Sequence, residues 1–380
     1  MISNRLALLS CFAFLAFGTG CRCTDTCVEL PFPGLKADLA QTISNHATLR
    51  LMIVHGMSNH TQGYSSNFVD TIARKLKLNQ ISSEVEVLTG KGGLTNGFLR
   101  KVDLGRGETN LISAYELTWS PATFSEKVKR FEYDARLDGK RASLNRQLKS
   151  GLLNDGFADA ILYLNDDFRP RIQEPVTNAI WKILDGDFKT NDLFVIVTHS
   201  LGSKITFDSL NIISDEMVER KSPQAVGLTN LAAGLSHLVM LANQVPLLRL
   251  GETNVLADRK PEEKPSAVQK FLNTRRKALQ QRARAGQQKP EVKVIAVTDP
   301  NDLLSYPLRR EDLITDTSSD IKFGNLFICN APAFLHWIAN PVKAHEGYFD
   351  NPRLVDLLIK GNSKPEKICL KEAPLKNKSE

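Results

Sequence analysis

The chain has 380 residues, of which 42% are hydrophobic and 24% are charged. This length and composition are ample for a large buried core, in one α/β domain with insertions or in two domains. The formal net charge of +7 is unevenly placed, because residues 252–290 hold ten Lys or Arg against four acidic residues. The rest of the chain is close to neutral, so its charge does not favour nucleic-acid binding and no nucleic-acid partner is expected.

The first twenty residues have the layout of a secretory signal peptide. Arg5 provides a positive start, Leu6–Phe17 is apolar, and Gly18–Gly20 offers the small residues of a cleavage site. The apolar stretch is short for a transmembrane helix, and no later run is long enough to span a bilayer. We therefore expect residues 1–20 to be removed on export, with a retained N-terminal anchor as the alternative.

Cys21 directly follows the small residues, an arrangement that resembles a bacterial lipobox, in which that cysteine carries the lipid. The expected product is an exported lipoprotein, either periplasmic or attached to the outer membrane or cell surface. Simple secretion after Gly20 is the alternative. In an oxidising compartment the four remaining cysteines could form two disulfides. These cysteines are Cys23, Cys27, Cys329 and Cys369.

Beyond the leader, a weakly patterned stretch gives way to alternating strands and helices. Residues 21–47 predict a tether that leads into the folded domain. The apolar run Leu49–Val54 predicts a strand, and residues 66–78 predict a helix with one apolar face. The further expected elements are strands at Val85–Leu88 and Ile112–Trp119, a mainly helical stretch over 122–190, strands at Leu238–Leu241, Val292–Val297 and Leu326–Cys329, and a last helix over 352–360.

Short apolar strands that alternate with helices predict an α/β fold, with a mainly parallel central sheet covered by helices on both faces. We place this domain at residues 48–361, with helical insertions at 122–190 and 252–290 and a C-terminal tail at 362–380. In such sheets the functional groups collect on the loops that follow the carboxyl ends of the strands. Each candidate residue is therefore expected just after a strand.

The most informative segment is 193–203, an apolar run that ends in Thr198-His199-Ser200-Leu201-Gly202. A buried strand that feeds a tight turn around a serine exposes that serine as a nucleophile at the start of a helix. Gly202 lets the strand and the helix pass close together, while Thr198 occupies the position where glycine is commoner. The segment is a T-x-S-x-G variant of the nucleophile elbow.

A nucleophilic serine needs a base, which the chain should supply downstream of Ser200. His345 lies between the last expected strand and the last expected helix, which is the place expected of the base. His237 adjoins a strand ahead of every suitable acid, and His336 is flanked by large apolar residues typical of a core or lid position. His345 is therefore the predicted general base.

Two carboxylates follow the strand at 292–297, and either is able to orient the base. Asp302 precedes a Leu-Leu-x-x-Pro stretch, as orienting acids often do, and is the favoured acid. Asp299 comes directly off the strand, so it is the alternative acid or a brace for the turn.

An oxyanion hole requires two backbone N–H groups aimed at the developing negative charge. Leu201 follows the nucleophile at a helix N-terminus and supplies one donor. Met57, in the loop after the first strand, is the candidate for the other, because Gly56 lets the backbone approach closely. His55 and His199 are expected to shape their turns rather than to accept protons.

Taken together, four segments in this order resemble the α/β-hydrolase superfamily of lipases and esterases, over residues 48–361. The segments are His55-Gly56, Thr198–Gly202, Asp299–Asp302 and Ala344–Tyr348. The resemblance implies an α/β-hydrolase fold, with Ser200 as nucleophile, His345 as general acid/base, Asp302 as its orienting acid, and Met57 and Leu201 as oxyanion donors.

The expected activity is hydrolysis of carboxylic esters, with lipid or acyl esters as substrates, through an acyl-enzyme and without a cofactor or metal. An acyltransferase or thioesterase with the same triad is one alternative, and an inactive lipid-anchored binding scaffold is another. Substrate choice is expected to lie in the two insertions. The basic one at 252–290 predicts either an amphipathic helix that meets anionic head groups beside the cleft or a solvated surface helix.

Overall fold

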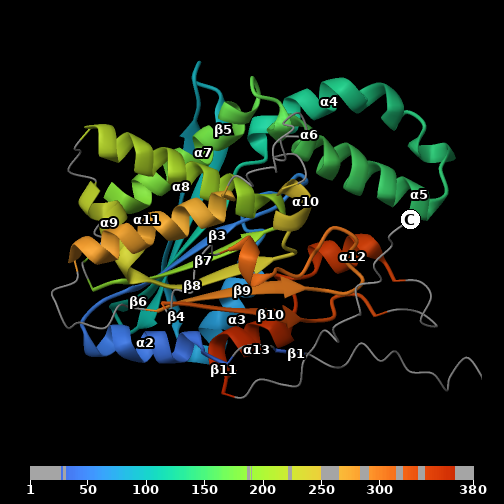
Figure 1. Cartoon of the computed structure of the whole chain (residues 1–380). Coiled ribbons are helices and arrows are strands. Elements are labelled where there is room, and N and C mark those ends of the chain that lie inside the picture. The colour runs from blue at the N-terminus through green and yellow to red at the C-terminus, as the bar shows by residue number, and fades with distance from the viewer. Residues whose placement is uncertain are drawn as a thin grey trace, which may run out of the picture.

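The main feature of the structure is one large, twisted sheet (Figure 1). The computed structural model describes residues 27–28, 31–185, 189, 191–220, 225–249, 265–282, 291–313, 320–332 and 339–363. Among these residues nine strands form the sheet, in the order β1 (Cys27–Val28), β10 (Ile321–Phe327), β9 (Val292–Thr298), β8 (Leu235–Leu241), β7 (Leu193–His199), β3 (Leu49–Val54), β6 (Thr109–Thr118), β5 (Thr95–Arg106) and β4 (Asn79–Thr89). The strands from β10 to β6 are parallel, whereas β1, at one edge, and β5 are antiparallel to their neighbours, as β4 is to β5.

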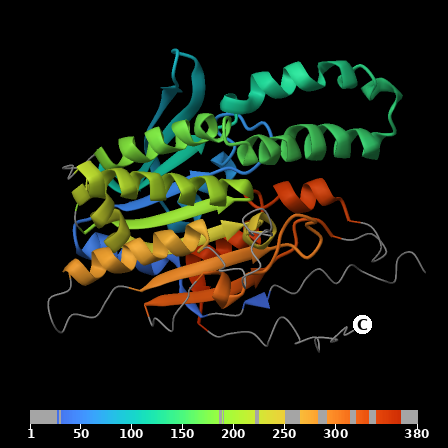
Figure 2. The same ribbon diagram turned by 45° about the horizontal axis from the view of Figure 1, so that its top comes forward.

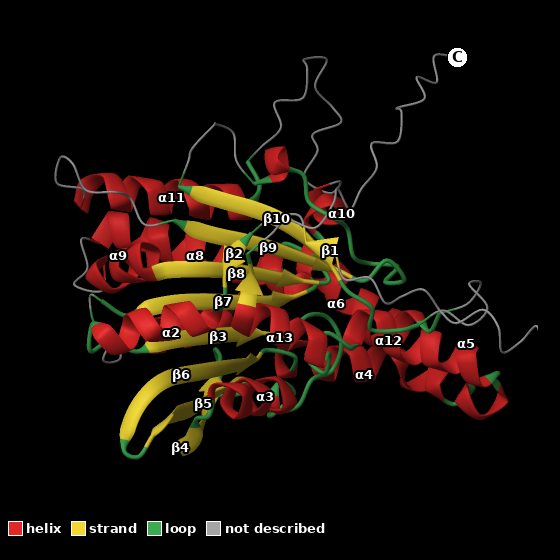
Figure 3. Cartoon of the chain, turned by 90° about the horizontal axis from the view of Figure 1, so that it is seen from below, coloured by secondary structure: helices red, strands yellow, loops and turns green. Residues whose placement is uncertain are grey.

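Helices cover both faces of this sheet, as Figures 1 and 3 show. One face carries α2 (Leu35–Ser44), α3 (Ser66–Leu76) and α13 (Pro352–Lys360), and the other carries α7 (Arg169–Asp185), α8 (Leu201–Arg220), α9 (Ala225–Gly234) and α11 (Ala267–Arg282). Shorter helices are α10 (Val245–Arg249), η4 (Arg310–Asp312) and α12 (Pro341–Glu346). The α/β class and the mainly parallel sheet expected from the sequence are confirmed.

The sheet divides the apolar interior into two cores, and β3 contributes to both. Met52 and Val54 join one apolar cluster, together with residues of α7, α8 and α11. Leu51 and Ile53 join the other, together with residues of α2, α3 and α13. Because successive side chains of a strand point to opposite faces, a strand covered on both faces reads as an unbroken apolar run. That is why the sequence alone located β3 correctly.

The structure differs from expectation at the β4 edge of the sheet. Only Val85–Leu88 was expected there, yet β4 spans Asn79–Thr89 and pairs with β5, which the sequence pattern did not predict. Nearly all side chains of β4 are exposed. An edge strand of this kind is held by its hydrogen-bond ladder more than by burial, so it carries little apolar periodicity for a sequence reading to detect.

The expectation of a tether over residues 21–47 does not hold for the residues of this stretch that the structure describes, 27–28 and 31–47. Residues 31–47 belong to the folded domain: β2 (Phe32–Pro33) pairs with β11 (Gly361–Asn362), and α2 packs on the sheet. Phe32, Leu35 and Leu39 are buried in the core beneath α13. The signal peptide at 1–20, the lipidation candidate Cys21 and residues 364–380 of the tail lie outside the described residues.

The first insertion is mostly helical, as expected, and its first part projects beyond the sheet (Figure 2). We refer to residues 121–164 as the helical arm. It contains α4 (Pro121–Ala135), η1 (Asp138–Lys140), α5 (Ser143–Gln147), η2 (Leu148–Phe157) and α6 (Ala158–Leu164). The segment η2 is a π-helix, a form that is rare and that is frequently found at functional sites.

The helix expected in the basic insertion forms and packs on the domain. The helix α11 packs against α8 and α9, and Arg275 is buried with its Nη1 3.2 Å from Asp320 Oδ2. Arg275 is therefore not available to an anionic head group, whereas Lys277 of the same helix is exposed. Residues 252–264 and 283–290 of this insertion lie outside the described residues. Among the helices that are described, none has the length and apolar character needed to cross a membrane.

The junction of β7 and α8 requires a residue without a side chain at position 202. A Cβ on Gly202 would lie 2.2 Å from the carbonyl oxygen of His55 and 3.1 Å from that of Val54, both of them backbone atoms. We expect Gly202→Ala to lower the free energy of unfolding by about 3 kcal/mol, because the backbone must move to make room. Chemical denaturation measures this. Gly139→Ala, where a Cβ meets nothing within 4 Å, is the matched control. Equal effects of the two substitutions would contradict the packing argument.

Candidate active site

Ser200 lies between β7 and α8 in a conformation that few residues adopt. Its φ is +52°, in the left-handed region that is uncommon for residues other than glycine. The turn is held by the Ser200 amide, which donates to the Leu241 carbonyl at 2.8 Å, and by the hydroxyls of Thr198 and Ser203, which are 2.8 Å apart. The elbow thus forms with threonine at position 198, because its hydroxyl bonds to the first turn of α8.

His345 reaches Ser200 from the far end of the chain. Its Nε2 is 3.1 Å from Ser200 Oγ, and its Nδ1 is 2.9 Å and 3.1 Å from the two carboxylate oxygens of Asp302. A carboxylate only accepts, so Nδ1 carries the proton and Nε2 is free to accept from the serine hydroxyl. His345 lies in the short helix α12 rather than in the expected loop, and Asn340 caps that helix.

The structure distinguishes the two candidate acids. Asp302, which is buried, faces His345 and also accepts from the Tyr348 hydroxyl at 3.0 Å and from the Leu304 amide at 3.0 Å. Asp299 accepts instead from three backbone amides, those of Asn301 (2.8 Å), Asn330 (2.5 Å) and Ala331 (3.2 Å). It thus joins the turn after β9 to the segment after β10, while Asp302 contacts the histidine.

The loop after β3 lies directly against the nucleophile. A Cβ on Gly56 would be 2.5 Å from Ser200 Cβ and 2.6 Å from His199 Nδ1. The next amide, that of Met57, and the amide of Leu201 donate no hydrogen bond to any described residue. Two unpaired N–H groups on the two segments that meet at Ser200 are the arrangement that an oxyanion hole requires.

His55 and His199 bond to the backbone around the site. His55 Nε2 accepts from the Trp119 amide at 3.0 Å, so its Nδ1 donates to the Gly56 carbonyl at 2.8 Å. His199 Nε2 donates to the His345 carbonyl at 2.8 Å. Both imidazoles are buried, and His55 stacks on the ring of Trp119.

Burial shifts the pKa values of several groups around the site. It lowers the pKa of His55 and of His199 well below the usual value, and nearby imidazoles lower both further. It lowers the pKa of His60 to about 4, and Lys127 adds to that effect. Burial, reinforced by the charge of Asp302, raises the pKa of Tyr348, which keeps its hydroxyl proton available to that carboxylate. These three imidazoles are therefore neutral at pH 7.

The depressed pKa of His60 predicts a loss of stability in mild acid. Between pH 7 and pH 5 the unfolded chain binds a proton at His60, whose ordinary pKa is 6.5, while the folded protein does not. Acidification therefore favours unfolding, by about 2 kcal/mol from this group over that interval. We expect His60→Gln to reduce the pH-dependent loss by that amount in chemical denaturation at the two pH values. An unaltered loss in His60→Gln would contradict the prediction.

Sequence reasoning missed four residues that support the site. Tyr348 bonds to Asp302, and His60 Nε2 donates to the Met57 carbonyl at 3.0 Å. On the helical arm, Asp159 accepts from the Ser58 amide at 2.9 Å and pairs with Lys127. The one available signal was Asp159 itself, an acid inside an apolar helical stretch.

The other histidines considered from the sequence do not reach Ser200. His237 lies near the start of β8, where its Nδ1 is 2.9 Å from Asp38 Oδ2 and its Nε2 is 2.8 Å from the Pro33 carbonyl. His336 lies outside the described residues. Within the described ranges no group of three or more His, Cys, Asp or Glu side chains is arranged to hold a metal ion.

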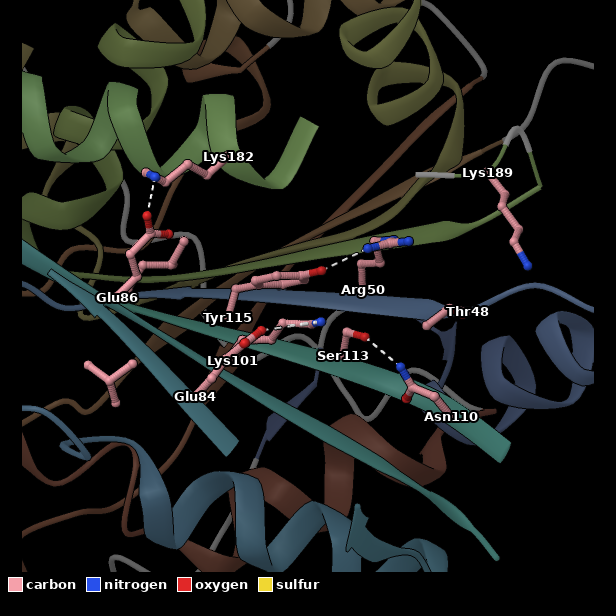
Figure 4. A pocket seen from close by; sticks show the side chains of 12 residues that line it. Thr48, Arg50, Glu84, Glu86, Lys101, Asn110, Ser113, Tyr115, Lys182 and Lys189 are labelled. Carbon is pink, nitrogen blue, oxygen red and sulfur yellow. Dashed lines mark hydrogen bonds and ion pairs between the residues drawn. The ribbon is translucent and has the colours of Figure 1, made fainter. Parts of the chain in front are cut away.

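A polar groove of about 910 Å³ lies away from the site, near the amino ends of β3 and β6 (Figure 4). Three of its cationic side chains have carboxylate partners: Arg50 pairs with Asp192 at 2.8 Å, Lys101 with Asp103 at 3.3 Å, and Lys182 with Glu86. The groove contains none of the residues that meet at Ser200. It is a part of the sheet's face that α7 leaves uncovered.

Residues from four distant segments therefore converge on Ser200, at the carboxyl ends of β3, β7, β9 and β10. The α/β architecture is compatible with that of an α/β-hydrolase. No protein-family model matches the chain, and no curated protein matches it either.

Proposed function

We propose that this protein is a serine hydrolase of the α/β-hydrolase type that cleaves carboxylic esters. One observation carries the proposal: Asp302, His345 and Ser200 form a continuous hydrogen-bonded series, with the serine in a left-handed turn between a strand and a helix. Nucleophile, base and orienting acid in this geometry are the parts that acyl transfer to a serine requires.

In the proposed acylation step, Ser200 Oγ attacks the carbonyl carbon of the ester while His345 Nε2 takes its proton. The carbonyl oxygen becomes an anion, which the amides of Met57 and Leu201 stabilise by hydrogen bonds. The intermediate then collapses, the bond to the alcohol oxygen breaks, and His345 returns the proton to the leaving alkoxide. Asp302 holds the imidazole in the required tautomer and stabilises the imidazolium.

Deacylation reverses these roles with water as the nucleophile. His345 takes a proton from the water, the hydroxide attacks the acyl carbon, and the proton returns to Ser200 Oγ as the acid leaves. No step requires a metal or cofactor. An acyltransferase would differ only in using an alcohol in place of water, so product analysis separates the two.

Exposed apolar residues support acyl or lipid esters as substrates. Leu303, which follows the orienting acid in the sequence, is 66% exposed, and Ile161 of the helical arm is 67% exposed. Exposed apolar groups of this kind are suited to contact an acyl chain. The arm also exposes Phe124, Val128, Leu153 and Leu164.

Export of the protein is part of the same proposal. Cys329 is disulfide-bonded, and disulfides persist in oxidising compartments such as the periplasm. That supports the proposed signal peptide at 1–20. We further propose that a lipid on Cys21 attaches the mature protein to a membrane.

Labelling with a fluorophosphonate and a panel of esters with acyl chains of increasing length test the activity. We expect the probe to form one adduct, located on Ser200 by mass spectrometry of the digested protein, and we expect turnover of at least one ester class. Transfer of the acyl group to an added alcohol in preference to water would favour the acyltransferase. A protein that neither labels nor cleaves any ester would be the binding scaffold, and the proposal would fail.

A further inference from the structure

Ser58, next to the proposed oxyanion donor Met57, has an unusual backbone conformation. Its φ is +84°, and residues other than glycine rarely adopt positive values. Such a conformation costs about 1–3 kcal/mol and persists only where the surroundings hold it in place. The contacts around Ser58 therefore identify what fixes this loop.

Both polar ends of the peptide between Met57 and Ser58 are held. Its carbonyl oxygen, that of Met57, accepts from His60 Nε2 at 3.0 Å, and its N–H, that of Ser58, donates to Asp159 Oδ2 at 2.9 Å. Because a peptide unit is planar, two bonds at opposite ends fix its orientation and, with it, the rotation of the neighbouring Met57. The Met57 N–H, one peptide earlier, is the donor that the proposed mechanism uses.

The acceptor comes from the helical arm and carries a buried charge. Asp159 on α6 and Lys127 on α4 are 2.9 Å apart, and both side chains are almost completely buried. Burial raises the pKa of Asp159, and Lys127 opposes that shift. A buried ion pair contributes little net stability compared with apolar packing, so its presence here calls for another reason. The arm also contacts the loop directly, since the Asn59 side-chain amide donates to Asp155 Oδ1 at 2.9 Å.

We propose that Asp159, paired with Lys127, is a positioning residue for the oxyanion hole: by accepting the Ser58 amide it fixes the Met57–Ser58 peptide and so orients the Met57 N–H toward Ser200. This inference rests on the proposed hydrolase function. It makes the arm a structural component of the reaction centre, not only a cover over it.

Two double variants isolate the hydrogen bond from the ion pair. Lys127→Met with Asp159→Asn removes both charges and keeps an acceptor for the Ser58 amide. Lys127→Met with Asp159→Leu removes both charges and the acceptor, with a side chain of similar size. With p-nitrophenyl acetate as the probe, we expect the variant with Asp159→Asn to keep kcat within about threefold of wild type. The variant with Asp159→Leu should lose about 10- to 100-fold in kcat, less than complete loss of an oxyanion donor.

Two further measurements distinguish a positioning role from a purely structural one. KM should change less than about threefold in the double variant with Asp159→Leu, and its affinity for a trifluoromethyl ketone, which forms an oxyanion adduct on a serine, should fall by the same factor as kcat/KM. His60→Leu and His60→Gln repeat the comparison at the other end of the peptide without disturbing the ion pair. Only His60→Leu should show the loss in kcat, so the idea stays testable if the protein with Asp159→Leu does not fold.

The outcomes separate this inference from the function on which it rests. If wild type is active and the paired variants are equally active, the positioning role is wrong and the hydrolase assignment stands. If wild type neither hydrolyses the ester nor reacts with a fluorophosphonate, the proposed function fails and this inference fails with it.

Discussion

Ser200→Ala is expected to lower kcat for ester hydrolysis by about 10⁶-fold and to abolish fluorophosphonate labelling. The substitution removes the oxygen that attacks the carbonyl carbon and leaves His345 Nε2 without the hydroxyl that lies 3.1 Å away. It keeps the Cβ, so the left-handed turn at position 200 retains its geometry. Steady-state kinetics and thermal unfolding measure the two effects, and the fold should be unchanged.

Ser203→Ala is the matched control for this experiment. Ser203 is also buried, three residues along α8, and its hydroxyl is 2.8 Å from Thr198 Oγ1, not from the histidine. Its replacement should cost about 1 kcal/mol of stability through one lost hydrogen bond and leave kcat nearly unchanged. Residual hydrolysis in Ser200→Ala close to that of wild type would show that another residue is the nucleophile.

Asp302→Asn is expected to lower kcat by about 10⁴-fold with little change in KM. The amide removes the negative charge that stabilises the imidazolium. Its NH₂ group, turned toward Nδ1, favours the tautomer with the proton on Nε2, which is unable to accept from Ser200. The measurement is kcat/KM over a range of pH, together with fluorophosphonate reactivity, which should fall in parallel.

Asp299→Asn distinguishes the acid from the turn brace. Asp299 accepts from three backbone amides, and an amide side chain is able to satisfy fewer of them. We expect a loss of about 2 kcal/mol in the free energy of unfolding, because a buried donor is left unpaired. The loss of kcat should be far smaller than in Asp302→Asn. A larger loss of kcat in Asp299→Asn would reverse the assignment of the two carboxylates.

Local patterns located much of the site because each part lies where one element ends and the next begins. The strands β3 and β9 are apolar runs buried on both faces, and α13 has its buried residues on one side. The sequence therefore shows an unbroken apolar run for each strand and a helical spacing of apolar residues for α13. Ser200 follows β7 directly, Asp302 lies in the turn after β9, and His345 lies in the segment between β10 and α13. Their meeting in space then follows from the rule that the carboxyl ends of parallel strands share one edge.

Polar residues in unpatterned segments could not be placed in the same way. The exposed β4 edge, the packing of residues 31–47 and the pairing of His60 with Met57 have no periodic signature. The contact between Asp159 and Ser58 joins residues that are 101 positions apart, and the apolar helical stretch around that acid does not indicate which group it contacts. The sequence did not indicate the burial of Arg275 for the same reason, because its ion-pair partner Asp320 lies 45 residues later in the chain.

By itself, the sequence determined the class of fold, the elbow around Ser200, and the segments that carry a histidine and an acid. Those are consequences of hydrophobic period and turn chemistry, which act over a few residues. The tertiary structure alone decided that Asp302 and not Asp299 faces His345, and that a buried ion pair on the helical arm holds the loop of Met57. Hydrogen-bond partners and burial of single polar groups depend on how distant segments pack, and the local sequence does not encode that packing.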